Sequence, residues 1–230
     1  RLGLGYEDLR AVKPDIIMFS SSGQGQFGPH CLTPLFGHIQ LAVCGLNHFV
    51  GWPDLAPVGP YGPWTDFFTP HLLAAVTIAA LEYRDKTGKG QYIDASSVEA
   101  AIYGCLGSAI LDLTVNGREQ IRMGNHHPTA APHGTYRCQG EERWVSIAVF
   151  TDEEWAAFCR AIGGPAWSGE PRFSTLAGRK ASEDELDHLV QEWTAGYSAE
   201  EVMVLMQDAG VRAGVVQNAR DLHEDAQLRA

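Results

Sequence analysis

The sequence has little positive charge. Its 230 residues include 17 lysines and arginines against 28 aspartates and glutamates, which gives a formal net charge of −11. Nucleic-acid-binding surfaces neutralise phosphates with clustered cations, so this balance argues against DNA or RNA as a partner. A smaller anionic ligand is still compatible with it, because such a ligand needs only a local cationic patch.

Cysteine pairs and long apolar runs are also lacking. The five cysteines are scattered, odd in number and without CxxC spacing, which predicts reduced thiols in a cytoplasmic protein. The longest apolar run, near residues 72–81, is shorter than the roughly 20 residues that a membrane span needs, and no signal peptide is visible. With 45% hydrophobic residues, the chain has the material for a folded core.

The stretch from Pro57 to Asp94 organises the rest of the chain. A segment rich in proline and glycine leads to one carboxylate, Asp66, and the apolar run Leu72–Tyr83 then predicts a buried helix. A basic, glycine-rich segment ends this helix, and residues 91–95 have the pattern of a short strand. Asp66 is therefore expected at a tight turn just ahead of a helix, where N–H groups and the dipole favour negative charge. By itself, such a residue is more typical of a plain helix cap than of a nucleophile.

Other elements flank this stretch in the first half of the chain. Residues 15–20 predict a strand of a parallel sheet, followed by the glycine-rich loop SSSGQGQFGP at 20–29. Glycines at 23, 25 and 28 could let backbone N–H groups approach an anion, or could simply form a connection. Helices are predicted over residues 36–46 and 96–115, the latter capped by Ser96 or Ser97.

The composition changes at Gly124. A loop with two prolines and three histidines (His126, His127 and His133) precedes a predicted hairpin at 135–149. Adjacent histidines without helical or CxxC spacing do not predict a metal site, and the role of these three stays open. Helices starting at Thr151 and over 182–194 and 198–208 follow, then a strand at 211–216 and a helix from residue 219. The tryptophans at 144, 155, 167 and 193 are expected in the core.

Taken in order, these motifs resemble the class III CoA-transferases, which include the formyl-CoA, carnitine and bile-acid CoA-transferases. Asp66 stands before an apolar helix that ends in TGKGQ at 87–91. The resemblance extends over nearly the whole chain, through the 20–29 loop, PHGTYRC at 132–138, RW at 143–144 and AGVRAGVV at 209–216. Because family members extend further in both directions, the chain is expected to be a fragment that lacks both ends.

This resemblance implies an α/β fold that forms an interlocked homodimer. Residues 1–124 would be part of a large domain with a parallel, Rossmann-like sheet, and residues 125–220 a smaller α+β domain. Residues 221–230 would begin a segment that returns to the large domain.

The resemblance also implies an activity, the transfer of CoA between an acyl-CoA donor and a carboxylic acid. Asp66 would attack the donor thioester, and the resulting anhydride would become an aspartyl-CoA thioester. CoA and acyl-CoA would be substrates, with no bound prosthetic group, no metal, no nucleic acid and no membrane as partner. Gly23, Gly25 and Gly28 would line the CoA or substrate site.

The sequence departs from the family pattern in one loop and leaves two alternatives open. Formyl-CoA transferases close a glycine-rich loop over the reacting aspartate, whereas residues 124–134 contain no glycine run. The first alternative is a CoA-ester racemase or epimerase of the same fold, which carries Gly-His-Asp where this chain has Gly37-His38-Ile39. The second is a truncated chain that is not catalytic and only folds or dimerises.

Overall fold

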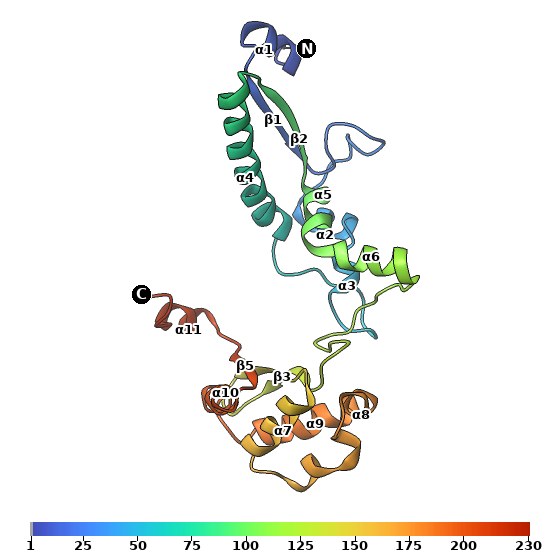
Figure 1. The fold of residues 1–230 in the computed structure, drawn as a ribbon, viewed down its shortest axis with the longest axis vertical. Helices are drawn as coiled ribbons and strands as arrows, with labels where there is room; N and C mark the ends of the chain where they lie inside the picture. Colours follow the sequence, from blue (N-terminus) through green and yellow to red (C-terminus); the bar gives the residue numbers. More distant parts are fainter. Residues whose placement is uncertain (1) are drawn as a thin grey trace. The chain divides into compact units, whose positions relative to one another are not determined.

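In the computed structural model, which describes residues 2–230, the chain divides after Gly124 into two compact units. The first unit, shown in blue to green in Figure 1, is built on two parallel strands, and the second, in yellow to red, on three antiparallel strands. The fold is therefore mixed α/β. In the first unit the elements follow the order α1 (Tyr6–Val12), β1 (Ile17–Ser22), α2 (Gly37–Val43), α3 (Leu46–Phe49), α4 (Trp64–Thr87), β2 (Gln91–Ser96), α5 (Ser97–Ala101), a π-helical segment (Ile102–Leu106) and α6 (Gly107–Asn116).

Strands β1 and β2 pair in parallel, with Ile17 opposite Gln91 and Ser22 opposite Ser96. Strand β1 begins two residues later than the predicted strand at 15–20 and includes the first serines of the glycine-rich loop. The parallel pairing places the ends of both strands at the same edge, so the loop after β1 lies beside the start of α5. The predicted Rossmann-like sheet is present only in part: the described residues of this unit contribute two parallel strands to it.

Helix α4 begins earlier than the apolar run predicted. It includes Pro70, which cannot donate a backbone hydrogen bond to the carbonyl of Asp66 four residues before it. Proline is a signal for a helix boundary in a sequence, and this explains why the predicted start was too late. The C-terminal end of α4, which carries the basic residues, is as expected: Gly88 has φ 71° and its N–H donates to Arg84 O at 2.7 Å.

The second glycine of TGKGQ has a steric role. A Cβ atom at Gly90 would lie 2.0 Å from the carbonyl oxygen of Ile16, which is closer than any real contact. The neighbouring residue Gln91 donates its N–H to the same carbonyl at 3.0 Å. Glycine at position 90 therefore lets the end of α4 approach the start of β1 closely enough for β2 to pair.

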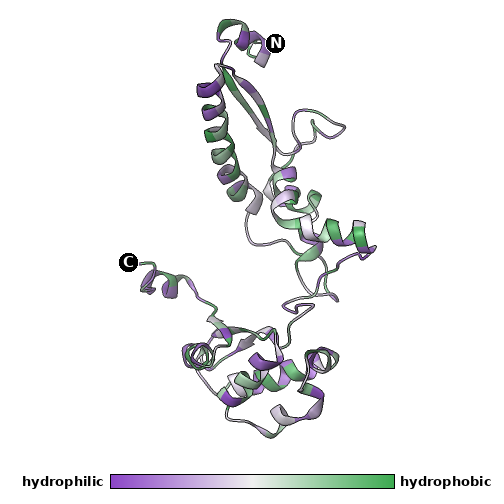
Figure 2. Cartoon of the chain, viewed as in Figure 1, coloured by the Kyte–Doolittle hydropathy of each residue, from purple (hydrophilic) through white to green (hydrophobic). Residues whose placement is uncertain are grey.

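Helix α4 is not the buried helix that the apolar run predicted. Thr65, Thr69 and Ala80 are its only buried residues, and Ile78 is 67% exposed. Figure 2 shows hydrophobic residues along α4 and α6, where they are largely uncovered within this chain. The first unit thus has a small core of its own, centred on Cys44, Val98 and Ala101.

Two helical stretches of the described residues are long and apolar enough to cross a membrane, namely 64–87 and 97–116. The apolar run near residues 72–81 is shorter than a span, but the helix that contains it, α4, has 24 residues. Length and composition are weak evidence for a span, since the core helices of water-soluble proteins satisfy the same criteria.

The second unit is an antiparallel sheet in the order β3-β4-β5, accompanied by helices. Alternate residues of β4 face the core, where Val145 and Ile147 are buried. The elements are β3 (His133–Arg137), β4 (Trp144–Ala148), α7 (Asp152–Ala161), two 3-10 turns (Ala166–Gly169 and Pro171–Phe173), α8 (Leu176–Ala181), α9 (Glu183–Thr194), α10 (Ala199–Asp208), β5 (Arg212–Val215) and α11 (Ala219–Glu224). The predicted hairpin, helices and final strand of this region are confirmed to within about two residues.

Three of the four tryptophans contribute to this core as predicted. Trp155 is buried, and Trp167 and Trp193 pack against the cluster around it. Trp144 is the exception: its ring is half-buried and lies 6.0 Å from the guanidinium carbon of Arg137. It occupies the first position of β4, which faces away from the buried Val145.

Arg179 is the central polar group of the second unit. Its side chain is fully buried, and its guanidinium donates to Ala131 O at 2.7 Å, Phe173 O at 3.1 Å and Asp152 Oδ1 at 2.9 Å. The same group lies 5.2 Å from the ring centroid of Trp155. A buried charge is tolerated only when its donors are satisfied, and these contacts tie α8 to three other segments.

We expect Arg179→Met to lower the free energy of unfolding by about 3 kcal/mol, because two buried carbonyls lose their donor while most of the volume stays filled. Arg160→Met on the exposed face of α7 is the matched control and should change it by less than about 0.5 kcal/mol. Urea denaturation measures both. Equal stability of the two variants would contradict this account of Arg179.

Candidate active site

Asp66 lies in the first turn of α4 rather than in the turn ahead of it. Its N–H donates to Pro63 O at 2.9 Å, and its side chain is exposed. The hydroxyl of the fully buried Thr65 lies 3.4 Å from Asp66 Oδ1. Position in the first helical turn still places the carboxylate at the positive end of the helix dipole. The carboxylate is thus accessible, negatively charged and held on a regular element.

The backbone of Gly37, the first residue of α2, lies directly beside this carboxylate. A Cβ atom at Gly37 would be 2.1 Å from Pro63 Cβ and 3.2 Å from Asp66 Oδ2. Only glycine fits without displacing the turn that holds Asp66. Gly37 was not predicted to be part of the site, because its contact with Asp66 joins segments about 30 residues apart and leaves no local pattern.

Other acids near Asp66 in the sequence are placed elsewhere. Asp54 is exposed in a separate turn. Glu82 is paired with Lys86 at 2.5 Å and lies 16 residues further along α4, or roughly 24 Å at 1.5 Å per residue. Neither acid shares the position of Asp66 at the start of the helix.

The three glycines of the loop after β1 have different surroundings. A Cβ atom at Gly23 would lie 2.8 Å from Leu35, whereas Gly25 has φ 85° and lies beside Asp94. Gly28, with φ 96°, has open space around it. Gly23 is a packing position, Gly25 permits a turn, and Gly28 is at the exposed part of the loop. Their assignment to a CoA site remains a prediction.

Asp94 anchors this loop to the sheet. Its Oδ2 accepts the N–H of Gln26 at 2.8 Å, and two residues further along β2 the Ser96 hydroxyl donates to Gly23 O at 3.1 Å. Ser96 also caps α5 by accepting the N–H of Glu99 at 3.1 Å, as predicted. The role of Asp94 was missed, although a polar residue near the carboxyl end of a parallel strand is a recognisable signal.

A cavity of about 300 Å³ lies between the helix that carries Asp66 and the strand that carries Asp94. It is bounded by α4, β2, α5 and the adjoining π-helical segment, and both Asp94 and Thr69, one turn after Asp66, line it. Within the described residues, Thr69 Oγ1 and Asp94 Oδ1 are buried without a hydrogen-bond partner. The cavity therefore lies within one helical turn of the nucleophile candidate and next to the residue that anchors the glycine-rich loop.

The histidine-rich loop is held by a polar network within the second unit. His126 Nε2 lies 2.8 Å from Asp187 Oδ2, and its Nδ1 lies 3.5 Å from Glu183. Asp187 also accepts the hydroxyl of the buried Tyr136 at 2.6 Å. Burial, together with the Asp187 carboxylate, raises the pKa of Tyr136 well above its ordinary value. These contacts give His126 a structural role.

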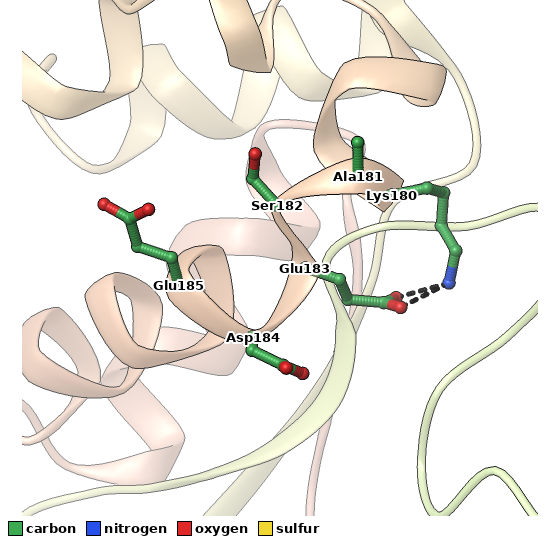
Figure 3. Close-up of a pocket in the computed structure, with 6 residues that line it drawn as sticks. All are labelled: Lys180, Ala181, Ser182, Glu183, Asp184 and Glu185. Atoms are coloured by element: carbon green, nitrogen blue, oxygen red, sulfur yellow. Dashed lines mark hydrogen bonds and ion pairs between the residues drawn. The ribbon is translucent and has the colours of Figure 1, made fainter.

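Lys180 completes this network on α8. Its ammonium donates to Glu183 at 2.5 Å and to the backbone carbonyl of His127 at 2.9 Å. Figure 3 shows the Lys180–Glu183 pair, with Asp184 and Glu185 pointing in other directions. Across residues 2–230, no group of three or more His, Cys, Asp or Glu side chains is arranged to hold a metal ion.

Comparison with known proteins identifies the family. The model of CoA-transferase family III matches residues 1–230, and the chain belongs to this family. It is 32% identical over 223 residues to the succinyl-CoA–D-citramalate CoA-transferase of Chloroflexus aurantiacus, covering 97% of the chain and 55% of that protein. It is 31% identical over 215 residues to the acetyl-CoA:oxalate CoA-transferase of Acetobacter aceti, covering 93% and 54%. The chain thus spans about half the length of these relatives.

A solved structure supports the fold. The crystal structure of a CAIB/BAIF family protein from Brucella suis matches with a TM-score of 0.88 and 28% identity. The match covers 99% of this chain and 59% of that one. The mixed α/β arrangement described above is therefore that of a known family.

We expect Asp94→Ala to free the glycine-rich loop from the sheet, because the carboxylate that accepts the Gln26 N–H is removed. A hydrogen bond to a charged group contributes about 1.5–3 kcal/mol, so exchange of the Gln26 amide should accelerate at least about tenfold. Hydrogen exchange measured by NMR tests this. Asp94→Asn keeps an acceptor oxygen and should retain most of the protection of the Gln26 amide. Equal exchange of this amide in the wild type, Asp94→Ala and Asp94→Asn would rule out the anchoring role of Asp94.

Proposed function

We propose that the protein moves CoA between an acyl-CoA donor and a carboxylic acid, with Asp66 as the nucleophile. The observation that carries this proposal is an exposed carboxylate, Asp66, in the first turn of α4, in a chain that belongs to CoA-transferase family III. The relatives named above use succinyl-CoA or acetyl-CoA as donor and an organic acid as acceptor. These names support thioester and carboxylate substrates as a class.

The proposed reaction balances without an external reagent. An oxygen of Asp66 attacks the donor carbonyl, the C–S bond breaks, and CoA leaves as a thiolate. The thiolate then attacks the side-chain carbonyl carbon of the resulting anhydride and releases the donor acid as a carboxylate. This leaves CoA bound to Asp66 as a thioester.

The second half of the reaction repeats these steps with the acceptor. The acceptor carboxylate attacks the aspartyl thioester and again expels the thiolate. The thiolate attacks the acceptor's carbonyl carbon in the new anhydride, which forms the new acyl-CoA and regenerates Asp66. No step needs a prosthetic group or a metal.

The position of Asp66 suits this chemistry. The positive end of the α4 dipole favours the carboxylate that must attack, and the missing side chain of Gly37 leaves space beside Oδ2. Each tetrahedral oxyanion needs donors, and we assign these to backbone N–H groups of the loop containing Gly25 and Gly28. Such a donor typically contributes about 3 kcal/mol to lowering the barrier.

Asp66→Asn in the full-length protein should lower CoA transfer at least about a thousandfold, because the amide keeps the shape but is not a nucleophile. Asp54→Asn, in an exposed turn, is the matched control and should retain wild-type activity. Hydroxylamine added with an acyl-CoA donor should convert Asp66 to a hydroxamate that mass spectrometry locates.

Two outcomes would contradict this proposal. Near wild-type transfer by Asp66→Asn would remove Asp66 from the mechanism. Incorporation of deuterium at the α-carbon of an acyl-CoA, without an acceptor acid, would instead indicate the racemase or epimerase reaction.

The exposed apolar surface of the first unit supports an interlocked homodimer. Phe67 is 68% exposed, Tyr103 81% and Val115 69%, and these side chains come from α4, the π-helical segment and α6. Apolar surface of this extent is usually covered by another chain or domain. All five cysteines are free, which supports a reducing compartment such as the cytoplasm.

Light scattering on the full-length protein should therefore report twice the mass of one chain. The 230-residue chain expressed alone should bind a hydrophobic dye more strongly than the full-length protein, because the apolar faces of α4 and α6 remain uncovered. A monodisperse full-length monomer would refute the homodimer.

A further inference from the structure

A second cavity in the first unit, which we call the apolar pocket, is separate from the one beside Thr69. It measures about 210 Å³ and lies between the end of α2, α3, the π-helical segment and α6. Most of its wall is apolar and comes from Cys44, Phe49, Ile102, Leu106, Ala109 and Leu113. π-helical turns occur frequently at functional sites, and Ile102 and Leu106 are the two ends of the one found here.

Hydrogen bonds hold the rim of the apolar pocket in place. Asp112 accepts from Asn116 at 2.7 Å, from Arg118 at 2.7 and 3.0 Å, and from Gln120 at 3.3 Å. These donors lower the pKa of Asp112 to about 2. The segment that carries Glu119 and Gln120 is thereby tied to α6, so the rim is formed before any ligand binds.

Helix α2 connects the apolar pocket to Asp66. Its first residue, Gly37, lies beside the Asp66 carboxylate, and Cys44 directly after its last residue lines the pocket. Seven helical residues span roughly 10 Å at 1.5 Å each. An acyl group whose carbonyl is at Asp66 therefore needs a tail of about that length to reach the pocket.

The lining determines which tail fits. A cavity of about 150 Å³ lined by aliphatic and aromatic side chains is large enough to hold benzene, so this pocket accepts a group of at least that size. Among the described residues that line it, the polar side chains are those of His48, Glu119 and Gln120, and none is lysine or arginine. Glu119 would repel a second carboxylate on the substrate, and burying that charge against a mostly apolar wall without a lysine or arginine would be costly.

We propose that the apolar pocket binds the tail of the acyl substrate, and that this tail is an uncharged aliphatic chain or ring. The inference rests on the proposed function, since it assumes that the acyl carbonyl reacts at Asp66. It separates this protein from relatives named for succinyl, citramalate or oxalate groups, which are charged at the distal end.

The experiment compares acyl-CoA donors with the full-length protein. Decanoyl-CoA and 6-phenylhexanoyl-CoA, whose tails extend about 10 Å from the carbonyl, should be used with kcat/KM at least about tenfold higher than succinyl-CoA. Ala109→Phe fills the pocket and should lower kcat/KM for 6-phenylhexanoyl-CoA at least tenfold by raising KM. Transfer from acetyl-CoA, which does not reach the pocket, should stay within twofold. Ser108→Phe places the same ring at the neighbouring exposed position of α6 and is the matched control, expected to leave both donors unchanged.

A second variant covers the case in which Ala109→Phe does not fold. Leu113→Ala enlarges the pocket at a half-exposed position and should shift the preferred donor toward longer chains. Preference for succinyl-CoA, or equal effects of Ala109→Phe on acetyl-CoA and 6-phenylhexanoyl-CoA, would overturn the assignment of the pocket. Asp66-dependent transfer of acetyl-CoA would still leave the proposed function standing. Absence of any CoA transfer by the wild-type protein would overturn both.

Discussion

The parallel pairing of β1 and β2 determines where the candidate site residues of the first unit lie. Two parallel strands must be joined by a crossover, and here the crossover contains α2, α3 and α4. The pairing brings the loop after β1 and the start of α5 to one edge, where Asp94 and Ser96 bind the loop backbone. Gly90 permits this pairing, since a side chain there would collide with Ile16.

Close backbone contacts then position the nucleophile candidate. Gly37 lies against the turn that holds Asp66, and Gly104 lies against the ring of Phe68, where a Cβ atom would be 2.6 Å from the ring. The rings of Trp64 and Phe68 stack with centroids 5.1 Å apart on the first turns of α4. The start of α4 is thus held from two directions, by α2 and by the π-helical segment. Rigid support of this kind keeps a reacting group in a productive geometry.

The two units differ in how much of their stability they supply themselves. The second unit packs 17 buried residues into one cluster and satisfies a buried guanidinium at its centre. The buried cluster of the first unit comprises three residues, and its longest helix keeps most of one face exposed. The first unit also carries the candidate nucleophile. Another chain or domain packed on its apolar faces would therefore help to exclude water from the anhydride of the proposed reaction.

The sequence by itself determined the kinds of element and the identity of the candidate nucleophile. Caps such as Ser96 and Thr151, the glycine at the end of α4 and the alternation in β4 are local signals, and they predicted most elements to within about two residues. The order of the motifs, with Asp66 ahead of TGKGQ, was enough to predict the family.

Only the tertiary structure decided which residues surround Asp66. Gly37 lies beside the Asp66 carboxylate, and Thr69 and Asp94 line one cavity, through contacts between segments distant in sequence. The extension of α4 through Pro70 and the exposure of its apolar residues likewise depend on what packs against the helix. Local propensity acts over a few residues, whereas close approach and burial are set by the whole fold, which is why the sequence identified the carboxylate but not its surroundings.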